Sequence, residues 1–161
     1  LCFVGAADAV SEDLRVHKLR HAERMMLVAS PTNPLAEKAS VTWEDLGTCP
    51  LVLHGEGSVA RRIILEEFEE RGLRPNIAAE VDNVAYVKQL VEGRDAVALM
   101  FAPNVEEDVA QNRLKVLSWG GGEIQIGIDV VLRREAELAP ACSAFLKVLQ
   151  QQFGAAFAYS S

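Results

Sequence analysis

Residues 51–72 have the sequence LVLHGEGSVARRIILEEFEERG, which combines an apolar run, a glycine loop and an amphipathic segment. The run Leu51–Leu53 is typical of a strand buried on both faces. Ser58 stands where a helix N-cap is expected, and Gly72 marks the predicted end of that helix. An apolar stripe at helical spacing lies between them: Ala60, Ile64, Leu65 and Phe68. In open α/β sheets, ligands bind at the loop after such a strand, where a helix start presents N–H groups to an anion.

The strand–loop–helix pattern recurs immediately downstream. Residues 76–81 predict a strand, Asp82 or Asn83 predicts a helix cap, and Gly93 predicts the end of that helix. Residues 96–101 (AVALMF) predict another buried strand. The helix between these strands carries an apolar set that is expected to face inward: Val84, Val87, Leu90 and Val91. The segment is therefore βαβαβ, which implies parallel strands joined by right-handed crossovers.

The flanking segments predict further strands and helices. Strands are expected over residues 1–6, 14–19 (as an edge strand), 25–29, 114–119 and 123–133, the last with clean alternation. Helices are expected to start at Thr42, with Asp45 completing a capping box, at Pro103 and at Pro140. The last helix is expected to turn one face inward: Cys142, Phe145, Leu146, Leu149 and Phe153. Residues 120–122 are all glycine and predict a flexible turn.

Composition excludes several classes of function. The chain has 161 residues, and half of them are hydrophobic, so a packed core is expected. Phosphate binding needs clustered lysine and arginine, so the net charge of -7 argues against a nucleic-acid surface in this chain. No apolar run approaches the ~20 residues that a membrane helix requires. Cys2, Cys49 and Cys142 form no CxxC pair and predict free thiols in a reducing cytoplasm.

The histidines carry alternative interpretations. His17 and His21 are four residues apart, which on a helix would suit a metal ion, but the segment predicts a strand and is rich in arginine and lysine. His54 follows the buried strand and would act as a catalytic base only with a nucleophile and an orienting partner. Ser58 is close in sequence but is expected to serve as a cap. Neither a metal site nor catalysis is therefore expected.

The loop at residues 54–58 (HGEGS) is neither a P-loop nor a dinucleotide-binding fingerprint. It lacks the Gly-Lys-Ser/Thr element of a P-loop and the third glycine of a dinucleotide fingerprint. Arg61 and Arg62 fall in the first turn of the predicted helix, where positive charge is locally disfavoured. Two interpretations remain open: the arginines form a solvated face, or they attract an anionic ligand to the loop.

The order of these elements resembles the effector-binding (substrate-binding) domain of LysR-type transcriptional regulators. Residues 24–36 (RMMLVASPTNPLA) are similar to a strand and turn of that family, and residues 41–46 (VTWEDL) to its next segment. Residues 90–93 (LVEG) with 98–103 (ALMFAP) are similar to its "LVaaGlGiallP" stretch, and residues 138–149 to its closing helix. Further residues fit the end of a family helix: Phe68, Gly72 and Pro75.

The chain departs from the family pattern at a few positions. Asp95 stands where the family usually has glycine, and residues 32–33 (TN) replace Asp-His. Phe101 and Ala102 precede Pro103 where the family is shorter. Asp95 and the Phe101–Ala102 pair alter the wall of the expected cleft, so the ligand class is left open.

The resemblance implies an α/β, two-lobed, periplasmic-binding-protein-like (type 2) fold with an effector cleft between the lobes. Residues 1–34 are expected to form part of lobe one, 35–114 a complete lobe two, and 115–153 the return to lobe one, with residues 154–161 as a tail. Lobe one is expected to be N-terminally truncated. Family members carry an N-terminal winged helix-turn-helix, so DNA is expected to be a partner only through that missing domain.

The resemblance also implies the site and the partners. Effector contacts are expected on the cleft loops: Gly5, Ala6, Gly57, Ser58, Val59, Asn83, Phe101 and Pro103. The expected effector is a small anionic or polar metabolite, and the expected protein partner is a second copy, in a homodimer or higher oligomer. No catalytic residue, cofactor, metal or membrane is expected, and the protein is placed in the cytoplasm. Two alternatives stay open: a solute-binding protein of a transport system, and an enzyme that uses His54 or a free cysteine.

Overall fold

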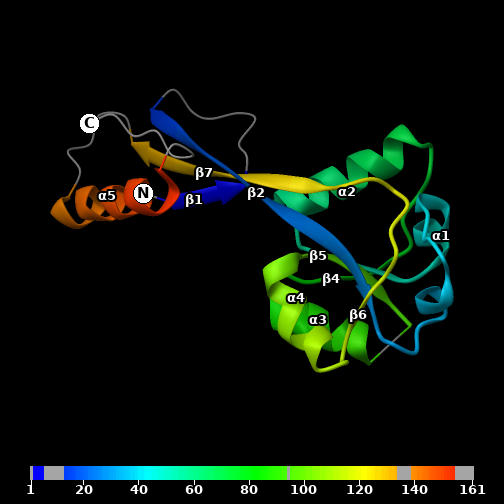
Figure 1. Ribbon diagram of the computed structural model, residues 1–161. Helices are drawn as coiled ribbons and strands as arrows, with labels where there is room; N and C mark the ends of the chain where they lie inside the picture. The colour runs from blue at the N-terminus through cyan, green and yellow to red at the C-terminus, as the bar shows by residue number, and fades with distance from the viewer. Residues whose placement is uncertain (1, 6–12, 94, 134–138, 155–161) are drawn as a thin grey trace. The chain divides into compact units, whose positions relative to one another are not determined.

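The computed structural model describes residues 2–5, 13–93, 95–133 and 139–154 (Figure 1). Its contacts divide the chain into two compact units. Arg24–Ile124 is here called the central unit, and Leu1–Glu23 with Gln125–Ser161 is called the terminal unit. The central unit includes the expected lobe two, residues 35–114, but the lobe boundaries themselves stay a prediction.

The central unit is built on a sheet whose inner strands are parallel. The strand order is β2 (Leu14–Ala29), β5 (Val97–Phe101), β3 (Leu51–Leu53) and β4 (Ile77–Glu80). β3 pairs in parallel with both β4 and β5. The second half of β2 is antiparallel to β5. The carboxyl ends of β3, β4 and β5 therefore lie at the same edge of the sheet.

Helices connect and cover the parallel strands. α2 (Val59–Glu70) joins β3 to β4, α3 (Val84–Glu92) joins β4 to β5, and α4 (Ala102–Ala110) follows β5. The predicted βαβαβ segment is thus confirmed. In Figure 1, α3 and α4 lie on one side of these strands and α2 on the other. Cover on both faces explains why β3 and β5 are continuous apolar runs.

Alternate strand residues pack against the two helical layers. One buried cluster joins the sheet to α3 and α4: Val28, Val52, Val87, Val91, Ala96, Ala98, Met100, Val105 and Leu114. Of the predicted α2 stripe, Ala60, Ile64 and Phe68 are buried, at most 3% exposed, whereas Leu65 is only half-buried. Full burial of a large apolar side chain contributes about 1.5–3 kcal/mol relative to exposure. The sheet is therefore held by apolar contacts on both faces.

α2 begins and ends where the sequence predicts. Its N-cap is Ser58. Gly72 has φ of 66°, a left-handed conformation that favours glycine. The Gly72 amide donates to the Glu69 carbonyl at 2.9 Å, and the Leu73 amide donates to the Phe68 carbonyl at 2.9 Å. This pair of hydrogen bonds is the Schellman motif, so the helix ends for local reasons.

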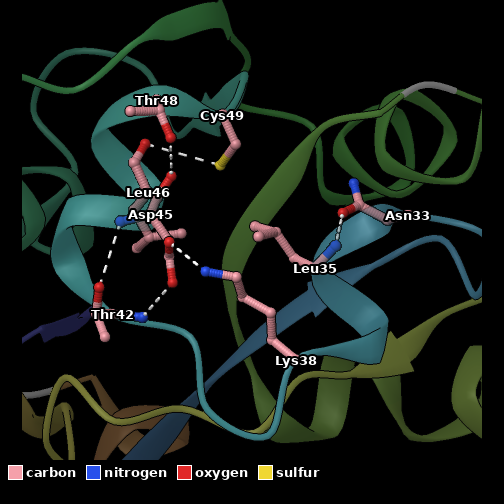
Figure 2. Close-up of polar contacts among 8 residues, drawn as sticks. All are labelled: Asn33, Leu35, Lys38, Thr42, Asp45, Leu46, Thr48 and Cys49. Carbon is pink, nitrogen blue, oxygen red and sulfur yellow. Dashed lines mark hydrogen bonds and ion pairs between the residues drawn. The ribbon is translucent and has the colours of Figure 1, made fainter.

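α1 (Trp43–Thr48) is a short helix with the predicted capping box (Figure 2). The Asp45 amide donates to Thr42 Oγ1 at 3.4 Å, and the Thr42 amide donates to Asp45 Oδ2 at 3.1 Å. Lys38 Nζ lies 2.6 Å from Asp45 Oδ1. The Lys38 hydrogen bond, followed by that of the Thr42 amide, holds the pKa of Asp45 below its usual value. The carboxylate therefore stays charged and keeps the cap in place.

Two short elements complete the central unit. η1 (Pro34–Glu37) is a 3-10 helix capped by Asn33, whose Oδ1 accepts from the Leu35 amide at 2.9 Å (Figure 2). β6 (Lys115–Val116) pairs antiparallel with the end of β2. The strand predicted over residues 114–119 is therefore shorter than expected.

Two of the three glycines at residues 120–122 make close contacts that the prediction of a flexible turn did not include, whereas Gly122 is open and has φ of 96°. Trp43 Nε1 donates to the Gly121 carbonyl at 3.1 Å, and the Trp43 and Trp119 rings meet edge to face with centroids 5.0 Å apart. A Cβ on Gly121 would lie 2.0 Å from the Trp119 ring, and a Cβ on Gly120 would lie 2.4 Å from a serine hydroxyl. Gly120 therefore leaves room for Ser40, which is distant in the sequence, and Gly121 leaves room for the ring of Trp119, two residues earlier.

The terminal unit contains an antiparallel sheet. β1 (Cys2–Gly5) pairs with β7 (Gln125–Arg133), and β7 lies next to β2. β2 is one strand of 16 residues, so the separate strands predicted over 14–19 and 25–29 are continuous. The prediction was wrong there because pairing with neighbouring strands overrides the weak strand propensity of the polar residues between them.

α5 (Pro140–Phe153) packs on this sheet with most of its predicted inner face. Leu146 and Leu149 join a buried cluster with β2 and β7, and Phe153 packs against it. Phe145 is 39% exposed, so its predicted inward position is wrong. On a helix its direction differs by about 100° from that of its neighbour Leu146, which takes the inner position. The predicted tail, apart from Gly154, lies outside the described residues.

A buried carboxylate ties α3 to α4. Asp108 on α4 is 4% exposed, its Oδ2 lies 2.6 Å from Lys88 Nζ on α3, and its Oδ1 contacts the Arg113 guanidinium. The Lys88 hydrogen bond and the weaker effect of Arg113 hold the pKa of Asp108 below its ordinary value, against the effect of burial. The ion pairs therefore keep a buried group charged.

Replacing Asp108 by Asn should lower the free energy of unfolding at neutral pH by about 2 kcal/mol, because hydrogen bonds to charged groups contribute about 1.5–3 kcal/mol. A carboxylate with a depressed folded pKa stabilises the fold above its ordinary pKa, and this contribution is lost as the pH falls through the folded value. The difference between wild type and Asp108→Asn should therefore shrink below about pH 4. Urea denaturation at several pH values measures it, and a pH-independent difference would contradict the ion-pair interpretation.

Candidate functional site

Helix starts follow each of the parallel strands at the carboxyl edge of the central unit. The N-caps are Ser58 after β3, Asn83 after β4 and Phe101 at the end of β5. The loops 54–59, 81–84 and 101–103 are here called the carboxyl edge. In open α/β sheets, ligands bind outside this edge.

The loop after β3 is fixed by its own backbone and by a neighbouring loop. The Ser58 amide donates to the Gly55 carbonyl at 3.3 Å, and Ser58 Oγ accepts from the Arg61 amide at 3.5 Å. Gly57 has φ of 88°, a conformation that favours glycine. The Gly55 amide donates to Asp82 Oδ1 at 3.1 Å. The conformation of the loop therefore depends on Gly57 within the loop and on a hydrogen bond to Asp82 of the next loop.

A hollow of about 360 Å³ lies against this loop. It is lined by residues 56–59 and by side chains of α2: Arg61, Arg62, Leu65, Glu66 and Glu69. The predicted contacts Gly57, Ser58 and Val59 all belong to this lining. Small-molecule sites commonly have volumes of about 300–1,000 Å³, so the hollow has a suitable size.

The arginines at the start of α2 are both engaged by carboxylates. Arg61 Nη2 lies 2.5 Å from Glu80 Oε1, which joins α2 to β4. Arg62 Nη1 lies 3.1 Å from Glu66 Oε1, one turn further along the helix. Of the two interpretations left open by the sequence, these contacts favour paired surface charges over attraction of a ligand.

The other two helix starts at this edge are capped differently. Asn83 is exposed, and its Oδ1 accepts from the Tyr86 amide at 3.2 Å. Phe101 is half-buried and makes no side-chain cap hydrogen bond, and the exposed Pro103 in the first turn has no N–H to donate. The N-cap side chain of α3 therefore accepts a hydrogen bond from a backbone amide of the first turn, whereas α4 has no such side-chain cap.

The predicted site residues fall into two groups. Those of the central unit share the carboxyl edge: Gly57, Ser58, Val59, Asn83, Phe101 and Pro103. Gly5 is the last residue of β1 in the terminal unit, and Ala6 lies outside the described residues. Their role in binding stays a prediction.

Two features of this edge are not visible in the sequence. One is the contact between Asp82 and Gly55, which are 27 residues apart. The other is a groove of about 570 Å³ along the second half of β2, lined by residues 24–27 and by segments between 116 and 123. Met25 pairs with Phe101, so the groove begins beside the carboxyl edge. Both features depend on strand pairing between distant segments.

Two groups that an enzyme could use, His54 and Cys49, have pKa values shifted by burial. Burial is the main cause that lowers the pKa of His54, and the Asp82 carboxylate partly opposes it. Burial also raises the pKa of the Cys49 thiol to about 11, so it stays protonated at neutral pH. A protonated thiol is a weak nucleophile. The described geometry therefore offers His54 an acidic neighbour but offers Cys49 no activation.

Replacing Asp82 by Asn should lower the pKa of His54 further. The substitution removes the carboxylate that favours the imidazolium and leaves the burial that opposes it. An NMR titration of the His54 ring protons measures the change, with Glu92→Gln at the far end of α3 as the control. A His54 pKa that stays unchanged or rises in Asp82→Asn would show that Asp82 does not act on this histidine.

Metal binding finds no support in the described part of the chain. His17 and His21 both lie in β2, where residues four apart are separated by about 13 Å, too far to share an ion. No group of three or more His, Cys, Asp or Glu residues in the described ranges is placed to hold a metal ion. Within the same ranges, every helix is too short or too polar to cross a membrane.

The comparisons with known proteins identify the family. A family model of the LysR substrate binding domain matches residues 2–154. The chain belongs to this family. The HTH-type transcriptional regulator CbbR of Xanthobacter flavus is 31% identical over 134 residues, which are 82% of this chain and 40% of that protein. The HTH-type transcriptional activator CmpR of Synechocystis sp. is 24% identical over 125 residues, which are 78% of this chain and 41% of that protein.

Solved LysR structures share the fold. The regulatory domain of Synechocystis CcmR, in complex with 2-PG, has a TM-score of 0.79 and 17% identity and covers 95% of this chain and 74% of its own. The effector binding domain of QuiR, in complex with shikimate, has a TM-score of 0.78 and 20% identity and covers 94% of this chain and 70% of its own. These matches confirm the predicted α/β, periplasmic-binding-protein-like (type 2) fold.

The relatives also decide between the predicted classes of protein. CbbR and CmpR are transcriptional regulators rather than enzymes. Together with the family match, they confirm a LysR regulatory domain over the alternative of a transport solute-binding protein. The chain spans about two-fifths of the length of both regulators.

Proposed function

We propose that this LysR substrate-binding domain senses a small anionic or polar metabolite at the carboxyl edge, and that binding controls a winged helix-turn-helix of the full-length protein. The central observation is the loop 56–59, where a helix start lines a hollow of about 360 Å³. The positive end of a helix and its N–H groups favour an anion. The ligands named for two relatives support this choice, since CcmR is in complex with 2-PG and QuiR with shikimate, a carboxylate.

The acidic end of the ligand is assigned to the amides of Gly57, Ser58 and Val59. The Ser58 amide already donates to Gly55 at 3.3 Å, so Gly57 and Val59 are expected to contribute most. The negative charge of Glu56 repels an anion and limits the preference of the loop for an anionic ligand. A helix start contributes about 0.3–1 kcal/mol, whereas micromolar binding requires about 8 kcal/mol. The remaining contacts are proposed to come from the other predicted residues: Gly5, Ala6, Asn83, Phe101 and Pro103.

The protein is further proposed to act in the cytoplasm as a homodimer or higher oligomer without catalytic activity. The regulators that it matches support this assignment, because a transcriptional regulator works where the DNA is. The raised pKa of Cys49 also argues against thiol catalysis. DNA contact is assigned to the helix-turn-helix alone.

The present chain by itself should not bind duplex DNA selectively. Its net charge of -7 repels the phosphates of DNA, whose binding depends on clustered lysine and arginine. An electrophoretic mobility shift with promoter fragments at two salt concentrations measures this. A sequence-selective, salt-sensitive shift by the 161-residue chain would contradict the assignment of DNA binding to another domain.

Ser58→Asp and Ser58→Asn separate a binding loop from a mere helix cap. Aspartate and asparagine cap helices about as well as serine, so both variants should keep the thermal stability of wild type. They differ in one negative charge at the proposed anion position. In the Asp variant only, that charge should weaken the binding of an anionic ligand by about 1–4 kcal/mol, which lowers the affinity at least about fivefold.

Isothermal titration calorimetry of wild type and both variants with shikimate, 2-PG and a panel of small mono- and dicarboxylates measures the difference. Ser58→Ala serves as the stability control, with an expected cost of about 1 kcal/mol. If a carboxylate binds the Asp and Asn variants equally, the loop is only a cap and the site lies elsewhere. If no member of the panel binds wild type, the anionic assignment fails.

A further inference from the structure

Asp82 links two of the loops that form the carboxyl edge. It directly precedes the α3 cap Asn83, and its Oδ1 accepts a hydrogen bond of 3.1 Å from the Gly55 amide, 27 residues earlier in the chain. Gly55 lies between β3 and the α2 cap Ser58. One carboxylate therefore joins the start of α2 to the start of α3.

Gly55 leaves room for this carboxylate. Gly55 is buried, and a Cβ on it would lie 2.4 Å from Asp82 Oδ1 and 2.8 Å from Asp82 Cγ. Gly55 does not have a positive φ, so the backbone itself would accept alanine. The need for glycine therefore comes from the close approach of Asp82, and an added methyl group would displace the carboxylate.

The same contact fixes the backbone of the loop. Gly55 is held through its amide by Asp82 and through its carbonyl by the Ser58 amide, at 3.1 Å and 3.3 Å. Residues 56 and 57 are enclosed between these two anchored positions. Binding groups work only when they are held within about 0.5 Å of their productive position. Loss of the Asp82 contact would free one end of this turn.

We propose that Asp82 is a positioning residue of the effector site, which fixes the amides of residues 57–59 by holding Gly55 and does not itself contact the ligand. This inference rests on the proposed function, because it says how that same site is held in place. The carboxylate acts as a hydrogen-bond acceptor for the protein. An amide oxygen at this position should hold the loop as well, while it removes a negative charge near the ligand's acidic end.

The first test uses the ligand-free chain and amide hydrogen exchange measured by NMR. In Asp82→Ala the Gly55 and Ser58 amides should exchange about tenfold faster than in wild type, because a hydrogen bond of roughly 1 kcal/mol or more is lost. Asp82→Asn should restore the wild-type rates. Glu92→Ala, which removes an exposed carboxylate at the far end of α3, should change neither amide. Equal exchange in wild type and Asp82→Ala would overturn the proposal.

The second test is a double-mutant cycle between Gly55→Ala and Asp82→Ala. In wild type, the added methyl group displaces Asp82, so Gly55→Ala should accelerate exchange of the Ser58 amide about as much as Asp82→Ala does. In the Asp82→Ala background the carboxylate beside Gly55 is already absent, so Gly55→Ala should accelerate exchange of the Ser58 amide little further. Additive effects of the two substitutions would show that they do not act through one contact and would overturn the proposal.

The third test separates a positioning role from a purely structural one. Titration calorimetry with the carboxylate that binds wild type best should give at least about tenfold weaker binding to Asp82→Ala, which equals about 1.4 kcal/mol. Asp82→Asn should bind as tightly as wild type or more tightly. If Asp82→Ala exchanges faster but binds with unchanged affinity, Asp82 is structural only. If no carboxylate binds wild type, the proposed function fails, and with it the link to an effector, while the exchange rates still show whether Asp82 holds the loop.

Discussion

The parallel pairing of β3 with β4 and β5 is the constraint on which the rest of the central unit depends. Parallel neighbours need a crossover of about a dozen residues or more, and α2 and α3 fill these connections. Both helices must then start at the same edge of the sheet. The loops HGEGS and VDN are brought together by this pairing, although Gly55 and Asp82 are 27 residues apart.

Burial of the parallel strands also determines where polar chemistry can occur. The runs Leu51–Leu53 and Val97–Phe101 carry no polar side chain, and helices cover both faces of the sheet. Polar groups are therefore confined to strand ends, helix caps and paired charges. Asp108 is a buried paired charge, and it stays charged because Lys88 and Arg113 neutralise it. Backbone N–H groups at helix starts are then the polar groups best placed to meet a ligand.

Features that depend on near neighbours in the sequence could be predicted, and features that depend on distant ones could not. The Ser58 cap, the Thr42–Asp45 capping box and the helix end at Gly72 each involve residues within five positions, and the structure has all of them. The continuity of β2, the hydrogen bond from Trp43 to Gly121 and the Asp82–Gly55 contact depend on strand pairing and tertiary packing. For the candidate site, the sequence indicated the loops, but not the carboxylate that connects them.

Capping and ligand binding at Ser58 are compatible, because they use different donors. A helix start leaves four backbone N–H groups without an intrahelical partner. The Ser58 side chain accepts from the Arg61 amide, the third residue of α2, at 3.5 Å. Val59 is the first residue of α2, so its amide is one of these N–H groups and is not the one that the Ser58 side chain caps. A serine at this position can therefore stabilise α2 through the Arg61 amide and still leave the Gly57 and Val59 amides to the proposed ligand, in a loop whose Gly55 amide is held by Asp82.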